Sequence, residues 1–239
     1  MGESSLRLER QLLRSGAVVA CGLDEVGRGS LSGPVTAGMV LVDASTSRSP
    51  DGLRDSKLLT ASVRERLVPG IKAWARGWSV GHASAEEVDG LGLIGALRLA
   101  GHRALADLPI VPDIVLLDGN HDWMSWPRQQ DLFSADLGEV LAGDRGPAEA
   151  VRIPRVMTLV KADLTCASVA AASVLAKVAR DAIMVELDVE FPEYGWRENK
   201  GYASARHIEA LRDIGSSVHH RRSWNLPSAS SGGEQPAHR

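Results

Sequence analysis

Residues 17–29 read AVVACGLDEVGRG, and this stretch decides the fold. Its first seven residues form an apolar run too short for a surface helix, so they predict a buried strand. Two acids, Asp24 and Glu25, follow the run directly, ahead of a glycine-rich turn. Placing two charges at the end of a buried strand is costly for a merely structural turn. On spacing alone, a structural turn and a functional acidic pair remain equal alternatives.

The chain on either side of this strand alternates between strand and helix patterns. The predicted elements, in chain order, are a short helix at 6–14, a strand at 35–42, a helix at 60–76, a strand at 78–83 and a helix at 91–108. The strand at 35–42 should pair with the first strand as a hairpin. Pro69 and Gly70 should kink or break the helix that contains them. Ser84 and Glu87 form a capping-box pattern ahead of the last helix.

Two later apolar runs are each followed by an acid. The run at 114–117 ends in Asp118, and the run at 156–160 is followed closely by Asp163. A helix of about two dozen residues begins at Thr165, with a small-residue face suited to close packing on a sheet. An antiparallel pair followed by strands that alternate with helices predicts a mixed sheet covered by helices.

The acids Asp24, Glu25, Asp118 and Asp163 should meet at one edge of this sheet, where strand ends place ligands. Clustered carboxylates raise one another's pKa, and bound cations resolve the repulsion. Oxygen ligands without sulfur or histidine favour Mg²⁺ or Mn²⁺, which borrow a substrate phosphate as a further ligand. Two such ions about 3.5 to 4 Å apart could activate a water for attack at phosphorus. Taken singly, an Asp at a strand end is more often a helix cap or turn residue.

Charge and cysteine content limit the binding partners and the cellular compartment that the sequence predicts. The formal net charge is −3, so a polyanion would have to be met by local patches. Residues 194–224 supply one, with six Lys and Arg against three acids. Cys21 and Cys166 lie far apart without metal-ligand spacing, which predicts a reducing compartment. No run approaches the roughly 20 apolar residues of a membrane span, so we expect a cytoplasmic protein that is not membrane-bound.

The run GLDEVGRG at 22–29, followed by SGPV at 32–35, closely resembles the first motif of the ribonuclease HII family. Further motifs follow in that family's order: DSKL at 55–58, LDG at 117–119, KAD at 161–163, AAASVLAKVARD at 170–181, KGYAS at 200–204 with His207, and HRRSW at 220–224. The resemblance covers roughly residues 17–225. It implies an α/β fold with an RNase H-like mixed five-stranded sheet flanked by helices, and a C-terminal helical appendage.

The same resemblance implies a metal-dependent endonuclease. Its expected reaction is hydrolysis of the RNA strand of RNA/DNA hybrids and nicking on the 5′ side of single ribonucleotides in duplex DNA, leaving 3′-hydroxyl and 5′-phosphate ends. It implies Asp24, Glu25, Asp118 and Asp163 as the catalytic metal ligands, for Mg²⁺ or Mn²⁺, with two ions when substrate is bound. The implied partners are RNA/DNA hybrids and DNA duplexes that contain ribonucleotides, and we expect a monomer.

Residues implied to bind substrate lie outside the acidic cluster. The family's Gly-Arg-Gly turn, here Gly27, Arg28 and Gly29, recognises the ribose 2′-hydroxyl, since glycine lets backbone approach a sugar closely. Tyr202 matches a tyrosine that packs on the deoxyribose beyond the ribonucleotide, and Lys57 matches a phosphate-contacting lysine. Each has a structural alternative: glycines needed only for their dihedral angles, an aromatic anchor for the terminal helix, and an exposed lysine at a helix start.

Several positions depart from the commonest family pattern. They are Ala162 for glycine, Leu164 for serine, Asn199 for histidine, Ser204 for threonine and Trp224 for phenylalanine. None removes a carboxylate, so they concern substrate positioning more than catalysis. Asp55, Asp181 and His207 are interpreted as structural, and Ser173, Lys177 and Arg180 as packing and phosphate-contact candidates.

The expected organisation has four parts: an N-terminal helical extension at 1–16, a catalytic domain at 17–190, a helical substrate-binding segment at 191–226, and a disordered tail at 227–239 without a partner-binding peptide. Three competing hypotheses are a type 1 ribonuclease H, a resolvase-like nuclease and a catalytically silent scaffold on the same fold. The Gly-Arg-Gly turn and Tyr202 argue against the two other nucleases, and the presence of all four acids argues against the scaffold.

Overall fold

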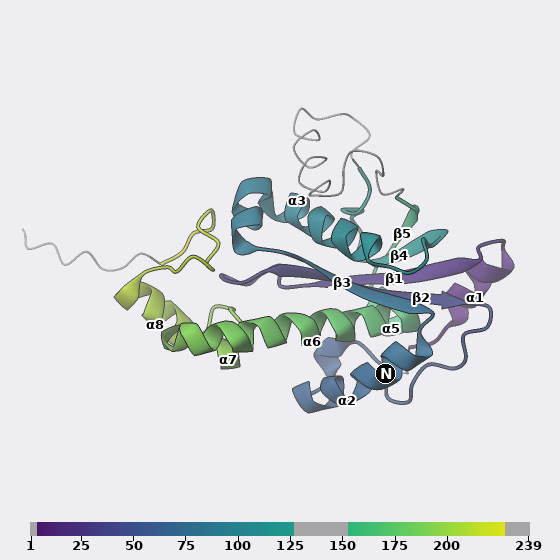
Figure 1. The fold of residues 1–239 in the computed structure, drawn as a ribbon, viewed down its shortest axis with the longest axis horizontal. Helices are drawn as coiled ribbons and strands as arrows, with labels where there is room; N and C mark the ends of the chain where they lie inside the picture. The colour runs from purple at the N-terminus through teal and green to yellow at the C-terminus, as the bar shows by residue number, and fades with distance from the viewer. Residues whose placement is uncertain (1–3, 127–152, 228–239) are drawn as a thin grey trace, which may run out of the picture.

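A five-stranded mixed sheet forms the centre of the protein (Figure 1). The computed structural model describes residues 4–126 and 153–227. The strands are β1 (Val19–Val26), β2 (Val35–Asp43), β3 (Gly77–Ala83), β4 (Ile114–Asp118) and β5 (Arg155–Leu159). Their order across the sheet is β3-β2-β1-β4-β5; β1 and β3 run antiparallel to β2, whereas β1, β4 and β5 are mutually parallel. This confirms the predicted sheet and the hairpin at its start.

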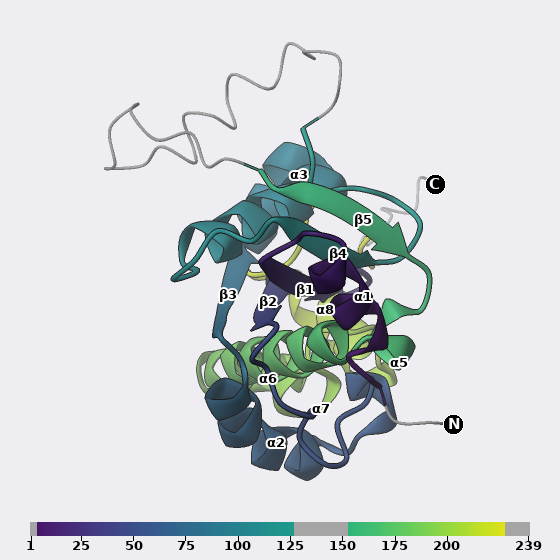
Figure 2. The same cartoon turned by 90° about the vertical axis from the view of Figure 1, so that its right-hand side faces the viewer.

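Helices cover both faces of the sheet, with α3 on one side and α6 on the other (Figure 2). Their bounds are α1 (Arg7–Arg14), η1 (Ser56–Leu58), α2 (Ala61–Trp74), α3 (Ala85–Ala106), α5 (Ala162–Thr165), α6 (Ala167–Glu190), η2 (Pro192–Tyr194), α7 (Trp196–Asn199) and α8 (Ala205–Ile214). The elements after α6 form the expected C-terminal helical region, at the end of α6 distant from β5 (Figure 1). Of the predicted tail, residues 228–239 lie outside the described part.

The helix boundaries confirm two sequence predictions and correct one. The capping box at Ser84 and Glu87 is present at the start of α3. The long helix of about two dozen residues is α6, which ends just before Pro192. The expected break at Pro69 is wrong, because α2 continues through it to Trp74. Buried Ile71 packs in the core beneath α6, and this packing outweighs the backbone hydrogen bond lost at the proline.

Glycines and alanines allow α6 to lie directly on the sheet. A Cβ at Gly22 would come within 2.2 Å of the backbone carbon of Ser168, and one at Gly38 within 2.4 Å of the carbonyl oxygen of Ala172. The facing residues of α6 are alanines at 167, 170, 171 and 172, all buried. Close contact here sets how far the helix stands from the carboxylates of β1.

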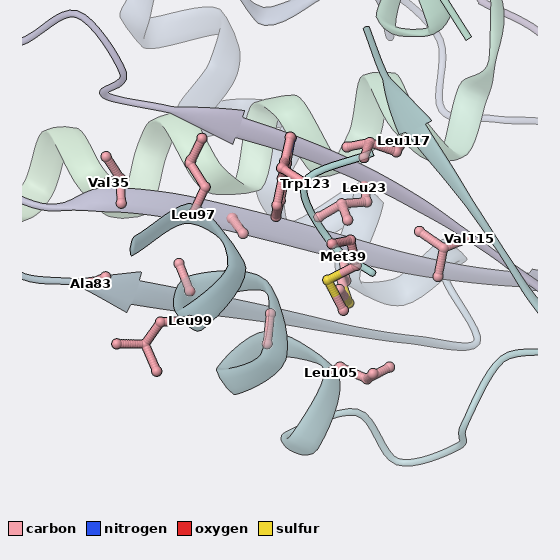
Figure 3. Packing of buried hydrophobic residues seen from close by; sticks show 14 of the residues in the cluster. Leu23, Val35, Met39, Ala83, Leu97, Leu99, Leu105, Val115, Leu117 and Trp123 are labelled. Carbon is pink, nitrogen blue, oxygen red and sulfur yellow. The ribbon is translucent and has the colours of Figure 1, made fainter. Parts of the chain in front are cut away.

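The opposite face packs larger side chains against α3 (Figure 3). Leu97 and Leu105 of α3 share one buried cluster with Leu23 and Met39 of the sheet, and with Trp123 from the segment after β4. Because successive residues of β1 point to opposite faces, Leu23 and Glu25 lie on this side, whereas Gly22 and Asp24 face α6.

The N-terminal extension is packed against the core rather than detached from it. Glu9 of α1 is fully buried, and its Oε1 accepts hydrogen bonds from the backbone N–H and the hydroxyl of Ser168, at 2.9 and 2.8 Å. It thus occupies donors in the first turn of α6. Among the helices of the described residues, none combines the length and apolar character needed to cross a membrane.

Candidate active site

The register of the parallel strands places Asp24 next to Asp118. Leu23 of β1 pairs with Leu117 of β4, so the residues that follow them stand side by side at the carboxyl ends of these strands. Both side chains point to the α6 face, because they share the parity of Gly22 and Leu116 along their strands. Asp24 and Glu25 lie within β1, which ends at Val26, and not after the strand as predicted.

Asp163 reaches the same place by a different route from the one predicted. It lies in the short helix α5, which follows β5, and not at a strand end. Lys161 adopts a left-handed conformation, with φ of 61°, and this turns the chain back towards β4. The backbone N–H of Ala162 then donates to Oδ1 of Asp118 at 2.7 Å. The left-handed residue is Lys161, so alanine at 162 meets no backbone penalty.

Electrostatic coupling links the four acids. Burial, and then the charge of Glu25, raise the pKa of Asp24 to about 8, and Asp118 adds to the effect. Burial is also the main cause of the raised pKa of Glu25, and Asp118 contributes there too. For Asp118, burial and the charge of Asp163 raise the pKa. The chain therefore brings together all four acids that the sequence singled out.

Cationic side chains partly neutralise this cluster. Arg28 donates to Oε1 of Glu25 at 2.9 Å, and Nζ of Lys57 lies 3.3 Å from Oδ2 of Asp163. Burial opposes the charge of Lys57, but the charges of Asp24, Asp55 and Asp163 outweigh it and raise the lysine pKa. Lys57 thus lies at the cluster, with a side chain that is 72% exposed.

The donor set fits a hard divalent cation. It consists of carboxylates alone, and Oε2 of Glu25 is buried with no hydrogen-bond partner in the described chain. Within residues 4–126 and 153–227, no three His, Cys, Asp or Glu side chains are already arranged around a common point with metal-binding geometry. Arg28, Lys57 and the backbone N–H of Ala162 instead each donate to one oxygen of Glu25, Asp163 and Asp118 respectively.

The Gly-Arg-Gly turn lies beside the cluster, immediately after β1. Gly27 has a φ of 89°, and a Cβ there would meet the Nε of Arg180 at 2.5 Å, so this position requires glycine for the fold. A Cβ at Gly29 would meet nothing within 4 Å, and its φ is ordinary. The protein's own packing gives no reason for glycine at 29. An open surface at this position suits the close approach of a ligand.

Tyr202 is held next to this turn. The carbonyl oxygen of Gly201 accepts hydrogen bonds from the backbone N–H groups of Leu31 and Ser32, at 2.8 and 3.3 Å. The ring of Tyr202 is 36% exposed and lies over the guanidinium of Arg180, 5.4 Å from carbon to ring centroid. Asn199 supports the loop, because its Oδ1 accepts from Gly201 and its Nδ2 donates to Tyr194.

A chain of two buried histidines supports the same loop. The backbone N–H of Ser217 donates to Nδ1 of His220, so the proton of neutral His220 lies on Nε2. That Nε2 lies 3.0 Å from Nε2 of His207, which must accept and therefore carries its own proton on Nδ1. Nδ1 of His207 lies 2.9 Å from the carbonyl oxygen of Tyr202. Burial lowers the pKa of both imidazoles, that of His220 to about 4.

Some supporting residues escaped the sequence analysis. Arg221 and His220 belong to a motif quoted above but carried no assigned role, and Trp123 lies in a segment without a periodic pattern. Trp123 is buried, and its indole N–H forms no hydrogen bond within the described residues but lies close enough to Glu25 to lower the pKa of that carboxyl. Asp55 caps η1 and Asp181 pairs with Lys177 and Arg64, contacts that suit the structural role expected of both.

Known proteins are similar to this chain in sequence and in fold. The family model described as Ribonuclease HII matches residues 21–226. Ribonuclease HII of Paracoccus denitrificans is 46% identical over 217 residues, covering 91% of this chain and 90% of the relative. Ribonuclease HII of Streptomyces coelicolor is 42% identical over 218 residues, covering 91% and 82%. The crystal structure of ribonuclease H2 from Pyrococcus horikoshii superposes with a TM-score of 0.63 at 25% identity, over 87% of this chain and 94% of that one.

The mixed sheet, its helical layers and these relatives define a metal-dependent ribonuclease with an RNase H-like fold. The family match spans the sheet, α6 and the C-terminal helical region together. The chain belongs to the ribonuclease HII family.

Proposed function

We propose that the protein hydrolyses the RNA strand of RNA/DNA hybrids and nicks duplex DNA on the 5′ side of single embedded ribonucleotides. The observation that supports this most directly is the juxtaposition at the end of β1. Four coupled carboxylates lie beside a turn whose Gly29 is open to a ligand. A phosphate that reaches the carboxylates places its neighbouring sugar against the Gly-Arg-Gly turn. Hydrolysis of the phosphate is therefore coupled to recognition of the ribose by the turn.

In the proposed mechanism Asp24, Glu25, Asp118 and Asp163 hold two divalent ions. When bound, these ions would supply an activated water and a counter-charge for the leaving oxygen, giving 3′-hydroxyl and 5′-phosphate ends. Arg28 and Lys57, released from Glu25 and Asp163, would turn to phosphate oxygens of the substrate. The carboxylate-only donor set supports Mg²⁺ or Mn²⁺ as the physiological metal.

Substrate discrimination is assigned to the turn and to Tyr202. Gly27, Arg28 and Gly29 would contact the ribose 2′-hydroxyl, the group that separates RNA from DNA at a given position. Tyr202 lies on the neighbouring loop, which is hydrogen-bonded to the residues that follow the turn, and would pack on the sugar that follows the ribonucleotide. Residues 191–226 would therefore serve as the substrate-binding segment of a monomer. The two buried, free cysteines, Cys21 and Cys166, are compatible with a cytoplasmic setting.

A DNA duplex with one embedded ribonucleotide tests the proposed function. In Mg²⁺ or Mn²⁺ the protein should nick it on the 5′ side of the ribonucleotide, and Asp118→Asn should eliminate the nick. Denaturing gel electrophoresis with end-labelled strands gives the position of the cut. Cleavage confined to tracts of several ribonucleotides would instead favour the type 1 activity, and no cleavage at all would reject both.

Tyr202→Ala should reduce cleavage at a single ribonucleotide about fivefold, and cleavage within an all-RNA strand much less, because stacking on one sugar contributes about 1 kcal/mol. Rates on the two substrates, measured under single-turnover conditions, give the comparison. Tyr202→Phe keeps the ring and is the matched control, which should retain the junction preference. An equal loss on both substrates would contradict the assigned role of Tyr202.

A further inference from the structure

Two arginines are fully buried between the Gly-Arg-Gly turn and the C-terminal helical region. Arg180 of α6 and Arg221, which follows α8, each have 0% exposure. Neither forms an ion pair with any carboxylate in the described part of the chain. Burial, and then the neighbouring charge of Arg180, lower the pKa of Arg221 to about 10. Burying two like charges without counter-ions is costly, so a purely structural explanation needs strong compensation.

Arg221 donates its hydrogen bonds to the carbonyl oxygens of the turn. Its Nη2 donates to the carbonyl of Gly27 at 2.6 Å and to that of Gly33 at 3.1 Å, and its Nη1 donates to the carbonyl of Arg28 at 3.0 Å. The donors lie 188 to 194 residues away from these acceptors along the chain. One planar group thus fixes both ends of the loop that joins β1 to β2.

Arg180 holds the same loop from the side of α6. Its Nε donates to the carbonyl of Pro34 at 3.0 Å, and its Nη2 donates to the hydroxyl of Ser30 at 2.8 Å and the carbonyl of Ser32 at 3.1 Å. Its Nη1 donates to the carbonyl of Lys200 at 2.7 Å, two residues before Tyr202. The same guanidinium therefore joins the turn to the loop that carries Tyr202.

We propose that Arg221 and Arg180 are positioning residues for ribose recognition, which hold residues 27–34 in the conformation that admits a 2′-hydroxyl. This rests on the proposed function. A guanidinium presents five donors in a rigid plane, whereas the ammonium of lysine is a single point with three donors. Lysine can retain the charge at these positions but cannot reach carbonyl oxygens on both sides of the loop. The turn therefore requires the planar geometry of the guanidinium groups, and not their charge alone.

A double-mutant cycle between Arg221→Lys and the substrate 2′-hydroxyl tests this. The substrates are DNA duplexes with one ribonucleotide or one 2′-deoxy-2′-fluoro nucleotide at the same position. The wild-type protein should prefer the ribonucleotide by about a hundredfold in kcat/KM, and Arg221→Lys should reduce this preference to about tenfold or less. Arg103→Lys is the matched control. Arg103 lies on α3, away from the turn, and like Arg221 it donates to a backbone carbonyl, in this case that of His82. It should leave the preference unchanged.

Amide hydrogen exchange of residues 27–34 supplies a second readout that needs no cleavage. Exchange there should become about tenfold faster in Arg221→Lys, while exchange in β2 stays the same. Arg180→Lys is tested in the same way if Arg221→Lys does not fold. A wild-type protein without ribose preference would reject the proposed function itself. An intact preference and unchanged exchange in a folded Arg→Lys variant would overturn the positioning role alone, as would failure of both variants to fold.

Discussion

Asparagine in place of Asp24 is expected to lower cleavage of a ribonucleotide-containing duplex at least about a thousandfold, and yet to stabilise the metal-free protein. Loss of activity follows from removing a ligand charge at the point where phosphate and cation meet. The gain in stability follows from burial, since Asp24 is 4% exposed and its pKa is raised to about 8. The hydrogen bond from the Glu25 backbone to Oδ1 survives in asparagine. We expect a gain of about 2 kcal/mol at pH 8, or about 5 °C in Tm.

The pH dependence of this gain has a definite sign. Folding raises the pKa of the Asp24 carboxyl, so the folded protein is most stable when this carboxyl is protonated. That contribution to stability is complete only below pH 3.8, the pKa of Asp24 in the unfolded chain. The wild-type protein should therefore lose stability relative to Asp24→Asn as pH rises from 4 to 8. Thermal unfolding in a chelator at several pH values measures the difference. Adding Mg²⁺ should raise the Tm of the wild type more than that of the variant.

Asp43→Asn is the matched control for Asp24→Asn. Asp43 lies at the far end of β2, and there the burial cost is outweighed by hydrogen bonds from Ser45 and Thr46 and by the charge of Arg76, so its pKa is lowered. Its replacement should therefore destabilise the protein and leave cleavage intact. A Tm of metal-free Asp24→Asn equal to or below that of the wild type at pH 8 would contradict the cost assigned to the buried carboxylate.

Alanine at position 22 is expected to destabilise the protein by about 3 kcal/mol or more, because the new methyl group would overlap the backbone of α6. The nearest atom, the carbonyl carbon of Ser168, would lie 2.2 Å away, and backbone cannot rotate aside as a side chain can. Relief of the overlap moves α6 and with it Ser173, whose hydrogen bond lowers the pKa of Asp24. Urea and thermal unfolding give the stability, and cleavage rates should fall in the fraction that remains folded.

Gly90→Ala is the control for Gly22→Ala. Gly90 lies in α3, where a Cβ would meet nothing within 4 Å, so alanine should be neutral or slightly stabilising. A Gly22→Ala protein with a Tm within about 2 °C of the wild type would show that α6 can move away from the sheet at little cost.

The strands and the four acids were predictable because their signal is local. An apolar run followed by Asp118, or by Asp24 and Glu25, marks a buried strand and its functional end within a few residues. Alternation along β1 then decides which face each acid takes, and this needs only the strand itself. Glu25 therefore lies on the face of Trp123, whereas Asp24 faces α6.

The rest depends on contacts that the sequence does not encode locally. Lys161 in a left-handed conformation is unusual for a residue with a Cβ, so the turn that brings Asp163 into place had no sequence signal. Pro69 sits inside α2 because packing beneath it overrides the local preference. Arg221 reaches the turn from 194 residues away, and neither composition nor periodicity reports such a pairing.

The straight course of α6 relates the two ends of the proposed site to each other. Ser173 on this helix lies close enough to Asp24 to lower the pKa of that carboxyl, and Lys177 and Arg180, further along the same face, lie 5.7 and 5.4 Å from the ring centroid of Tyr202. Seven residues of helix rise about 10 Å. In the proposed function α6 thus fixes the distance between the phosphate that is cut and the sugar at the junction. The position of the cut would then be set relative to the ribose, without reference to the bases.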